Sequence, residues 1–505
     1  MSVEIGKEWP PKADRHRLAL YDRYQKFFRG EHHEAFRYLG ARSDMDKDKR
    51  VRKIALIMNY PALITKGCTD ILCGEAPKFV VNSDTQDAKE VQAALSQLVR
   101  DSRFESVLYA AQTVNSYRGD AVFRVRDNGA RVVIEQIPAH NYFVELDPDN
   151  QAEVVAQCVA WVREGEKGMG VLRVEHHTAG QIINEAYSVK YLQGQRRWEV
   201  RGQIDLAEVY PEGDGPAEVQ FTGIDRPLLW HVPNFYDGES YWGLSDYGGG
   251  LDTLFEAANN RLSKIDSYLD RHQRPILVGI PGMSDTEGKV DSREDYVEPP
   301  TRDDGKDLPR YVTWDGQMTA AFEELQELKR QIRCQSETPK RLLGESEDTS
   351  IDSGRAMLND FIPITKKVNR KRTLVDPVVK EVLFTALTLH HLRYQGPDPT
   401  GFAVDVKWQD GIPQDYMESV QTEAARVQNG LSSKQSAIER IDVCTPEEAL
   451  AEIDRIHSET ESQASPGESP PAMAGESGVN AGPRAVTGAA ANTAPGARYP
   501  YPGTA

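Results

Sequence analysis

Long apolar runs are missing from the sequence. No segment approaches the roughly 20 consecutive apolar residues that a transmembrane helix needs, so we expect no membrane partner. The N-terminal stretch MSVEIGKEWPPKADRHR has no continuous apolar core behind its charges, which excludes a secretory signal. We therefore expect a protein that stays in the cytoplasm of the cell that makes it.

Cysteine is scarce as well. The five cysteines are an odd number scattered over the chain, which indicates reduced thiols rather than a disulfide framework. Cys68 and Cys73 form the one close pair, with C-x4-C spacing, and no second Cys/His pair follows them. A zinc site is therefore not expected, because a structural zinc site needs four ligands.

Positive charge is in deficit. Lys and Arg number 60 against 78 Asp and Glu, which gives a net charge of −18. Tight binding of nucleic acid through phosphate contacts requires the opposite balance. If this chain handles DNA, it must do so without gripping it, and the simpler meaning of the charge is solubility.

Motifs of catalysis are absent too. The sequence contains no G-x-x-x-x-G-K-[ST], no G-x-G-x-x-G after a strand, no H-E-x-x-H and no G-x-S-x-G. The glycine triplet Gly248 to Gly250 has no lysine placed to reach a phosphate. The adjacent pairs His32–His33 and His176–His177 would point their side chains apart. We expect no catalytic residue, no cofactor, no metal and no enzymatic activity.

The spacing of apolar residues changes along the length of the sequence. Helical spacing over residues 12–39, 60–74 and 90–117 gives way to a β-type meander that extends to about residue 230. Asn128-Gly129 predicts a tight hairpin turn within it, and Gly30 predicts the end of a helix. The fold class is therefore predicted to be α+β.

Helical spacing returns at residue 244. Leu251, Leu254, Ala258, Leu262, Ile265 and Leu269 form one narrow stripe, and a second helix follows after two short strands and a polar insert. A polar loop, Leu343 to Asp352, then leads into a long helix with Ser353 as a possible N-cap. Pro363 and Pro377 predict kinks in it. Gly430, with Ser432 or Ser433 as N-cap, separates two further helices, and the Ala/Gly/Pro/Ser-rich end is predicted to be disordered.

One basic cluster departs from the acidic balance: Lys366, Lys367, Arg370, Lys371 and Arg372. It is either the polar face of the long helix, solvated or paired with acids of a neighbouring element, or a surface that meets a passing polyanion. Contacts with a neighbouring subunit are a further possibility.

Four stretches together resemble the portal proteins of tailed bacteriophages, in particular the portal family of long-tailed phages. They are YDRYQKFFRGEHH, MNYPALITKGCTDILCGEAPKF, the segment from HVPNFYDGESYWGLSDYGGG to HQRPILVG, and WQDGIPQDYMESVQTEAARVQNGLSSKQSAIERI. Their number, order and spacing carry the resemblance over most of residues 20–457.

The resemblance implies a division of the chain. The wing would be residues 1–243 plus a strand within 396–414, the stem helices 244–271 and 315–342, and the clip 272–314. The tunnel loop would be 343–352, the long kinked helix 353–395, the helical crown 415–457 and the disordered tail 458–505. Candidate channel-lining residues in the tunnel loop are Glu345, Ser346, Glu347, Asp348, Thr349 and Ser350.

The resemblance also implies a function. Copies of the chain would form a ring, predicted to be a dodecamer, at one capsid vertex of a virion assembled in the host cytoplasm. Double-stranded DNA would pass through the channel without tight binding, driven by the terminase large subunit, and leave through a head-tail adaptor protein. Major capsid and scaffolding proteins would be further partners. The alternative is a non-conducting structural capsid or head-tail adaptor protein.

Overall fold

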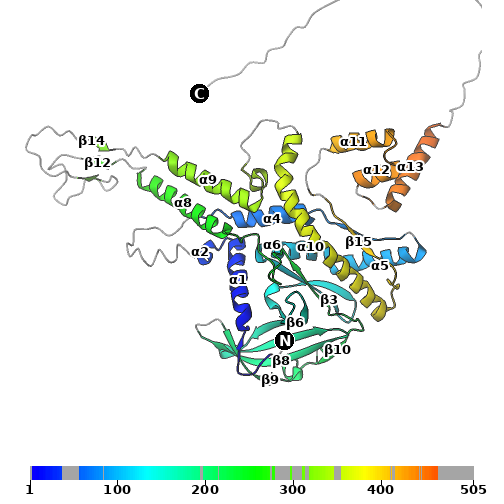
Figure 1. Ribbon diagram of the computed structural model, residues 1–505, viewed down its shortest axis with the longest axis horizontal. Helices are drawn as coiled ribbons and strands as arrows, with labels where there is room; N and C mark the ends of the chain where they lie inside the picture. The colour runs from blue at the N-terminus through cyan, green and yellow to red at the C-terminus, as the bar shows by residue number, and fades with distance from the viewer. Residues whose placement is uncertain are drawn as a thin grey trace, which may run out of the picture. The chain divides into compact units, whose positions relative to one another are not determined.

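The chain is an α+β protein made of two compact units, Met1–Pro413 and Gln414–Ala505. The computed structural model describes residues 3–36, 56–83, 85–193, 197–213, 215–272, 276–278, 296–297, 310–312, 318–345, 354–409, 411, 416–442, 444 and 446–464. Figure 1 follows the chain from blue to red through these segments. The predicted fold class is confirmed, and no described helix is long and apolar enough to cross a membrane.

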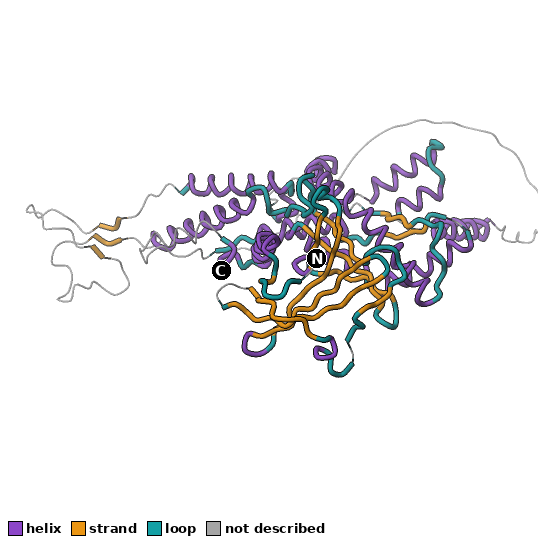
Figure 2. Tube along the Cα trace, turned by 60° about the horizontal axis from the view of Figure 1, so that its bottom comes forward, coloured by secondary structure: helices purple, strands orange, loops and turns teal. Residues whose placement is uncertain are grey.

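A seven-stranded sheet forms much of the first unit and confirms the predicted meander. Its strand order is β1-β9-β8-β7-β6-β5, and β10 pairs with β8. All of its pairings are antiparallel, and the strands lie side by side in Figure 2. The bounds are β1 Glu8–Trp9, β5 Tyr142–Leu146, β6 Val154–Glu164, β7 Met169–Thr178, β8 Gln181–Leu192, β9 Arg197–Ile204 and β10 Val219–Phe221.

A three-stranded sheet of order β11-β3-β4 lies in the same unit. Strands β3, Asp120–Asp127, and β4, Val132–Ile137, form the predicted hairpin, and β11 is Leu229–Pro233. At the turn, Gly129 has φ 86°, and the Asn128 side chain accepts hydrogen bonds from the backbone N–H groups of Ala130 and Arg131. These local bonds explain why the Asn-Gly pair predicted the turn correctly.

The N-terminal helices end where glycine allows it. Helix α1, Arg15–Arg29, ends at Gly30 with φ 82°, as predicted, and α2 is His32–Ala35. Helix α4, Tyr60–Cys73, is capped by the Asn59 side chain, which accepts a hydrogen bond from the Ala62 N–H. Buried Phe27 and Ile64 place α1 and α4 in one apolar cluster.

The single helix predicted over residues 90–117 is wrong in one respect, because the structure divides it. Helix α5 is Gln86–Ser102 and α6 is Phe104–Arg118. Arg103 between them adopts a left-handed conformation with φ 49°. The break turns the buried Leu95 face of α5 and the Phe104 and Leu108 face of α6 toward the same core.

Helices α8, Leu251–His272, and α9, Thr319–Ser336, lie side by side where the stem was predicted, with bounds shorter than expected. Buried Leu251, Ala258 and Ile265 of α8 share an apolar cluster with Leu325 and Ile332 of α9. Most of the predicted apolar stripe of α8 is thus buried in the contact with α9. Its last member, Leu269, is exposed.

A small sheet of order β13-β12-β14 falls between α8 and α9 in the chain, within the predicted clip. Strands β12, Ile276–Val278, and β14, Arg310–Val312, confirm the two short strands expected there. Strand β13, Tyr296–Val297, was not predicted. It pairs parallel with β12, whereas β14 pairs antiparallel with it.

Helix α10, Gly354–Tyr394, is continuous and contains both Pro363 and Pro377. Its apolar face is buried as the spacing predicted, with Ile364, Val375 and Val382 inaccessible to solvent. Strand β15, Val404–Lys407, pairs antiparallel with β2, Lys78–Val81, which confirms a strand within residues 396–414. The N-cap predicted at Ser353 lies outside the described residues.

The second unit is helical. Helices α11, Tyr416–Gln428, and α12, Lys434–Ile441, are separated at Gly430, and Ser433 caps α12 by accepting from the Ser436 N–H. Helix α13 runs from Pro446 to Ala464. The predicted start of disorder at residue 458 is therefore wrong, because the helix continues to Ala464. Residues 465–505 lie outside the described part of the chain.

Candidate functional site

The segment Gly243 to Gly250 leads from the first unit's sheets into helix α8. A Cβ atom on Gly243 would lie 2.2 Å from the carbonyl oxygen of Gly119, so only glycine fits this backbone crossing. Gly249 and Gly250 have φ 66° and 90° and precede Leu251, the first residue of α8. The glycine triplet therefore lies before the helix, where it shapes the turn and does not weaken the helix interior.

Asp246 lies in this segment and is the centre of a buried charge cluster. Its side chain has no exposed surface, and its two oxygens lie 3.2 Å and 2.6 Å from the ammonium nitrogens of Lys367 and Lys371. Ser116 donates a hydrogen bond of 2.5 Å to the carboxylate, and the Asn234 amide donates one of 3.2 Å. We call Asp246, Lys367, Lys371, Ser116 and Asn234 the junction cluster.

The charges of the junction cluster hold one another ionised. Burial alone would raise the pKa of Asp246, but Lys367 and Lys371 outweigh burial and keep that pKa well below its ordinary value. Burial would likewise lower the pKa of Lys371, and the Asp246 carboxylate reverses this and keeps the pKa above its ordinary value. Asp246 and Lys371 are therefore charged throughout the neutral pH range.

The junction cluster joins elements that are far apart in the sequence. Ser116 belongs to α6, Asp246 precedes α8, and the two lysines lie one helical turn apart on α10. Lys367 also donates a 3.1 Å hydrogen bond to the carbonyl oxygen of Ser336, the last residue of α9. The start of α8 and the end of α9 are thus fastened to the same turn of α10.

A second set of contacts fixes Glu345, a residue of the predicted tunnel loop 343–352. Glu345 accepts hydrogen bonds from the Tyr60 hydroxyl and from Arg333, and lies 3.9 Å from the Lys329 ammonium group. Burial and Glu345 together raise the pKa of Tyr60. Glu345 is therefore bound to α4 and α9. The other predicted loop residues, Ser346, Glu347, Asp348, Thr349 and Ser350, lie outside the described residues.

The predicted basic cluster divides into groups with different surroundings. Lys367 and Lys371 are buried, with 3% and 2% exposed surface, so the predicted DNA-facing or intersubunit role is wrong for these two. Their ammonium groups form ion pairs with Asp246 inside the chain. Arg370 is half exposed and makes a two-pronged ion pair with Glu337 at 2.6 Å and 2.7 Å. The pairing with acids of a neighbouring element, which the sequence left open, holds for these three.

The two remaining basic residues differ from each other. Arg372 is partly buried, donates to the carbonyl oxygens of Ile71 and Gln409, and lies 5.6 Å from the Trp408 ring. Lys366 is exposed. Of the five predicted basic residues, Lys366 and Arg370 are those with side chains still open to solvent.

Sequence reasoning missed Asp246. Its partners Lys367 and Lys371 are 121 and 125 positions away, so no local pattern connects them. A signal was nevertheless present, because both lysines fall beside Ile364, Val368 and Val375 on the apolar face of α10. A lysine in a buried stripe requires a buried acid.

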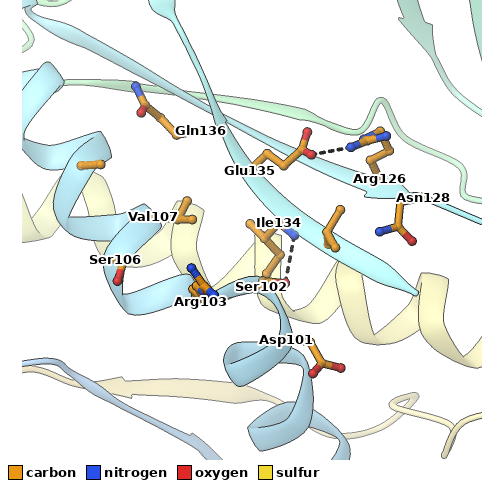
Figure 3. Close-up of a pocket in the computed structure, with 12 residues that line it drawn as sticks. Asp101, Ser102, Arg103, Ser106, Val107, Arg126, Asn128, Ile134, Glu135 and Gln136 are labelled. Atoms are coloured by element: carbon orange, nitrogen blue, oxygen red, sulfur yellow. Dashed lines mark hydrogen bonds and ion pairs between the residues drawn. The ribbon is translucent and has the colours of Figure 1, made fainter. Parts of the chain in front are cut away.

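A groove of about 480 Å³ lies elsewhere in the first unit, where β4 meets the break between α5 and α6. Figure 3 shows Arg126 paired with Glu135, and the Ser102 hydroxyl accepting a hydrogen bond from the Ile134 N–H. Arg103 and Asp101 also line the groove, so its charges balance. None of the predicted site residues lies there. Within the described segments, no group of three His, Cys, Asp or Glu residues is arranged to hold a metal ion.

Comparison with known proteins bears out the resemblance. Residues 251–465 match the family described as "Phage portal protein, SPP1 Gp6-like". The matched region begins at the first residue of α8 and ends one residue beyond α13. No curated protein matches the chain.

Three solved structures are similar to this chain. A chain from the virion of a native gene transfer agent (GTA) particle is 12% identical, with a TM-score of 0.43, and the match covers 87% of this chain and 96% of that one. A chain from the neck of a native GTA particle computed with C12 symmetry is 13% identical, with a TM-score of 0.43 and coverages of 86% and 95%. One from the neck of an empty GTA particle computed with C6 symmetry is 12% identical, with a TM-score of 0.42 and coverages of 87% and 96%.

Proposed function

We propose that this chain, which matches the phage portal family over residues 251–465, is a portal protein that forms a ring at one capsid vertex. The ring would be the channel through which double-stranded DNA is packaged, retained and ejected into the tail. The observation that carries the proposal is the family match, which takes in the helix pair α8–α9, the small sheet between them, α10 and the helices of the second unit.

The negative charge of the chain supports the passage of DNA through the channel without tight binding. Each copy carries a net charge of −18, so a ring of copies would carry a large negative charge that opposes tight binding of DNA phosphates. Over separations within the Debye length, about 10 Å at 0.1 M salt, this repulsion is only partly screened. Two of the five bases in the predicted basic cluster, Lys367 and Lys371, are buried inside the chain and share Asp246 as their counter-ion. A sliding polyanion would therefore meet few free cations on α10.

The junction cluster supports a mechanical role for the first unit. Because it fastens the start of α8 and the end of α9 to α10, a force on α8 or α9 would be passed to α10 through buried charges and not through a flexible linker. Residues 346–353 connect Glu345 to Gly354, the first residue of α10, and Ser346 to Ser350 would line the channel. In this proposal the loop contacts DNA while its two ends stay in place.

The proposed partners follow from the same role. Copies of this chain would close a ring through repeated contacts between neighbours, and a dodecamer is the predicted number. The terminase large subunit, the head-tail adaptor protein and the major capsid and scaffolding proteins would bind the ring during assembly in the host cytoplasm. The proposal gives the chain no catalytic step, so ATP or nucleic-acid hydrolysis by the purified protein would contradict it.

Deletion of residues 346–352 tests the conducting role. The deletion keeps buried Leu343 and the anchored Glu345, so ring assembly should survive while DNA packaging or retention falls. A chain in which the same seven residues are replaced by a Gly/Ser segment of equal length separates loop length from loop chemistry. Unchanged packaging by both variants would favour the alternative, a non-conducting capsid or adaptor protein. Loss of rings would contradict the placement of the loop.

A further inference from the structure

Arg173 on strand β7 is a buried charge without a described partner. Its exposed surface is 0%, and none of its three guanidinium nitrogens has a hydrogen-bond partner. A guanidinium carries five N–H donors and stays protonated in proteins. Leaving such a group buried and unpaired is strongly unfavourable, so an acceptor other than those of the described residues is required.

Aromatic rings surround the guanidinium group of Arg173. Its central carbon lies 5.0 Å from the centre of the Tyr210 ring and 6.0 Å from that of Trp161. Cation–π contacts use the flat faces of a guanidinium. The N–H donors, which lie in its plane, are not used by them and remain available for an acceptor.

The surrounding charges favour an anion as that acceptor. Glu175 follows two residues later on the same face of β7, but it is already bound by Arg124 at 2.5 Å. Arg163 lies on β6, with its guanidinium carbon 5.1 Å from the same Tyr210 ring. Burial lowers the pKa of Arg173, and Arg163 acts in the same direction. Arg124 pairs with both Glu135 and Glu175, and neither carboxylate forms an ion pair with Arg163 or Arg173.

Tyr210 covers the site close to the protein surface. It follows the short helix α7, Leu206–Val209, and its ring packs against Gly215, where a Cβ would lie 2.6 Å from the ring carbons. The next residues, 211–213, are exposed. The site is thus enclosed by a ring with a fixed position and separated from solvent by a short turn.

We propose that Arg173, walled by Tyr210 and Trp161, binds a small inorganic oxyanion of the phosphate type. Two oxygens of a tetrahedral oxyanion match the paired N–H groups of a guanidinium, which makes this class a better fit than a spherical ion. The anion would neutralise the surplus of positive charge between Arg163 and Arg173 and stabilise the seven-stranded sheet.

Titration of the full-length protein with sodium phosphate tests the proposal. Ionic strength is held constant with sodium chloride, and both the heat of binding and the melting temperature are measured. The wild type should show saturable binding and a melting temperature that rises with phosphate. Arg173→Met should bind at least about tenfold more weakly, because it loses the charged donors and keeps an apolar side chain of similar length. In a cryo-EM map of the wild type in phosphate buffer, density should lie beside the Arg173 guanidinium.

Two further variants complete the test. Arg103→Met removes an exposed arginine from the groove beside β4 and should bind phosphate as the wild type does. Arg173→Lys keeps the charge but loses the paired N–H donors of the guanidinium group. It should therefore also bind phosphate at least about tenfold more weakly than the wild type. If Arg173→Met does not fold, Arg173→Lys takes its place in the comparison. Equal binding by wild type and Arg173→Lys, or a wild type whose melting does not respond to phosphate, would overturn the proposal. Density for a water molecule alone would do the same.

Discussion

Replacing Asp246 by Asn should destabilise the first unit severely. Asparagine keeps the size of the side chain and can still bond Ser116, but it removes the negative charge that Lys367 and Lys371 share. Breaking a buried ion pair by removing one partner typically costs 3–5 kcal/mol. Here two ammonium groups with at most 3% exposed surface lose their common counter-ion, so we expect roughly 4 kcal/mol or more. Typical domain stabilities are about 5–15 kcal/mol.

Urea unfolding followed by tryptophan fluorescence measures this change. The triple variant Asp246→Asn, Lys367→Met, Lys371→Met removes all three charges and should recover most of the lost stability, because no unpaired charge remains buried. Glu327→Gln is the control. It breaks an ion pair with Arg330 on α9 that is more than half exposed, and should leave the unfolding midpoint unchanged.

Two outcomes would refute this reasoning. If Asp246→Asn unfolds at the same urea concentration as Glu327→Gln, the cluster does not hold the elements together. If the triple variant is less stable than Asp246→Asn, the cost does not come from uncompensated charge. The first result would mean that the junction cluster is not the link between α8, α9 and α10.

Two other predictions concern the same unit. His32 donates from Nε2 to the Phe27 carbonyl and accepts at Nδ1 from the Asn259 amide, so it is neutral, and burial lowers its pKa. Its contribution to stability is full above the unfolded pKa of about 6.5 and is lost as pH falls toward the lower folded value, by at most about 1.4 kcal/mol per pH unit. Between pH 7 and 5, urea unfolding should therefore show a larger loss for wild type than for His32→Gln. Gly243→Ala should lower the melting temperature more than Gly250→Ala. The first places a Cβ 2.2 Å from a backbone oxygen, whereas the second meets open space and only the strain of φ 90°.

Each of these predictions has a contrary result. Equal acid sensitivity of wild type and His32→Gln would mean that the fold does not lower the pKa of His32. Equal melting temperatures for the two glycine variants would mean that the close crossing of Gly243 and Gly119 yields easily to an added Cβ.

Local chemistry made much of the fold predictable. The meander, the end of α1 at Gly30, the cap at Ser433 and the apolar face of α10 all depend on residues within a few positions of one another. The break at Arg103 was not predictable in this way. Arginine has a good helix propensity, and the left-handed conformation is favoured there by burial of Phe104 and Leu108, which the local spacing does not reveal.

The candidate site was only partly predictable for a related reason. The sequence drew attention to the bases on α10 and to the glycines before α8, but the pairing of Asp246 with Lys367 and Lys371 spans more than a hundred residues. Such a contact depends on how α6, α8 and α10 meet. Spacing alone therefore assigned to the surface two lysines that the fold buries.

Electron microscopy of the purified full-length protein tests the central proposal most directly. A portal protein should appear as closed rings with a central channel, and the symmetry of the averaged rings should give the subunit number, predicted to be twelve. A uniform population of monomers under conditions of capsid assembly, or rings without a channel, would contradict the proposal that this chain conducts DNA.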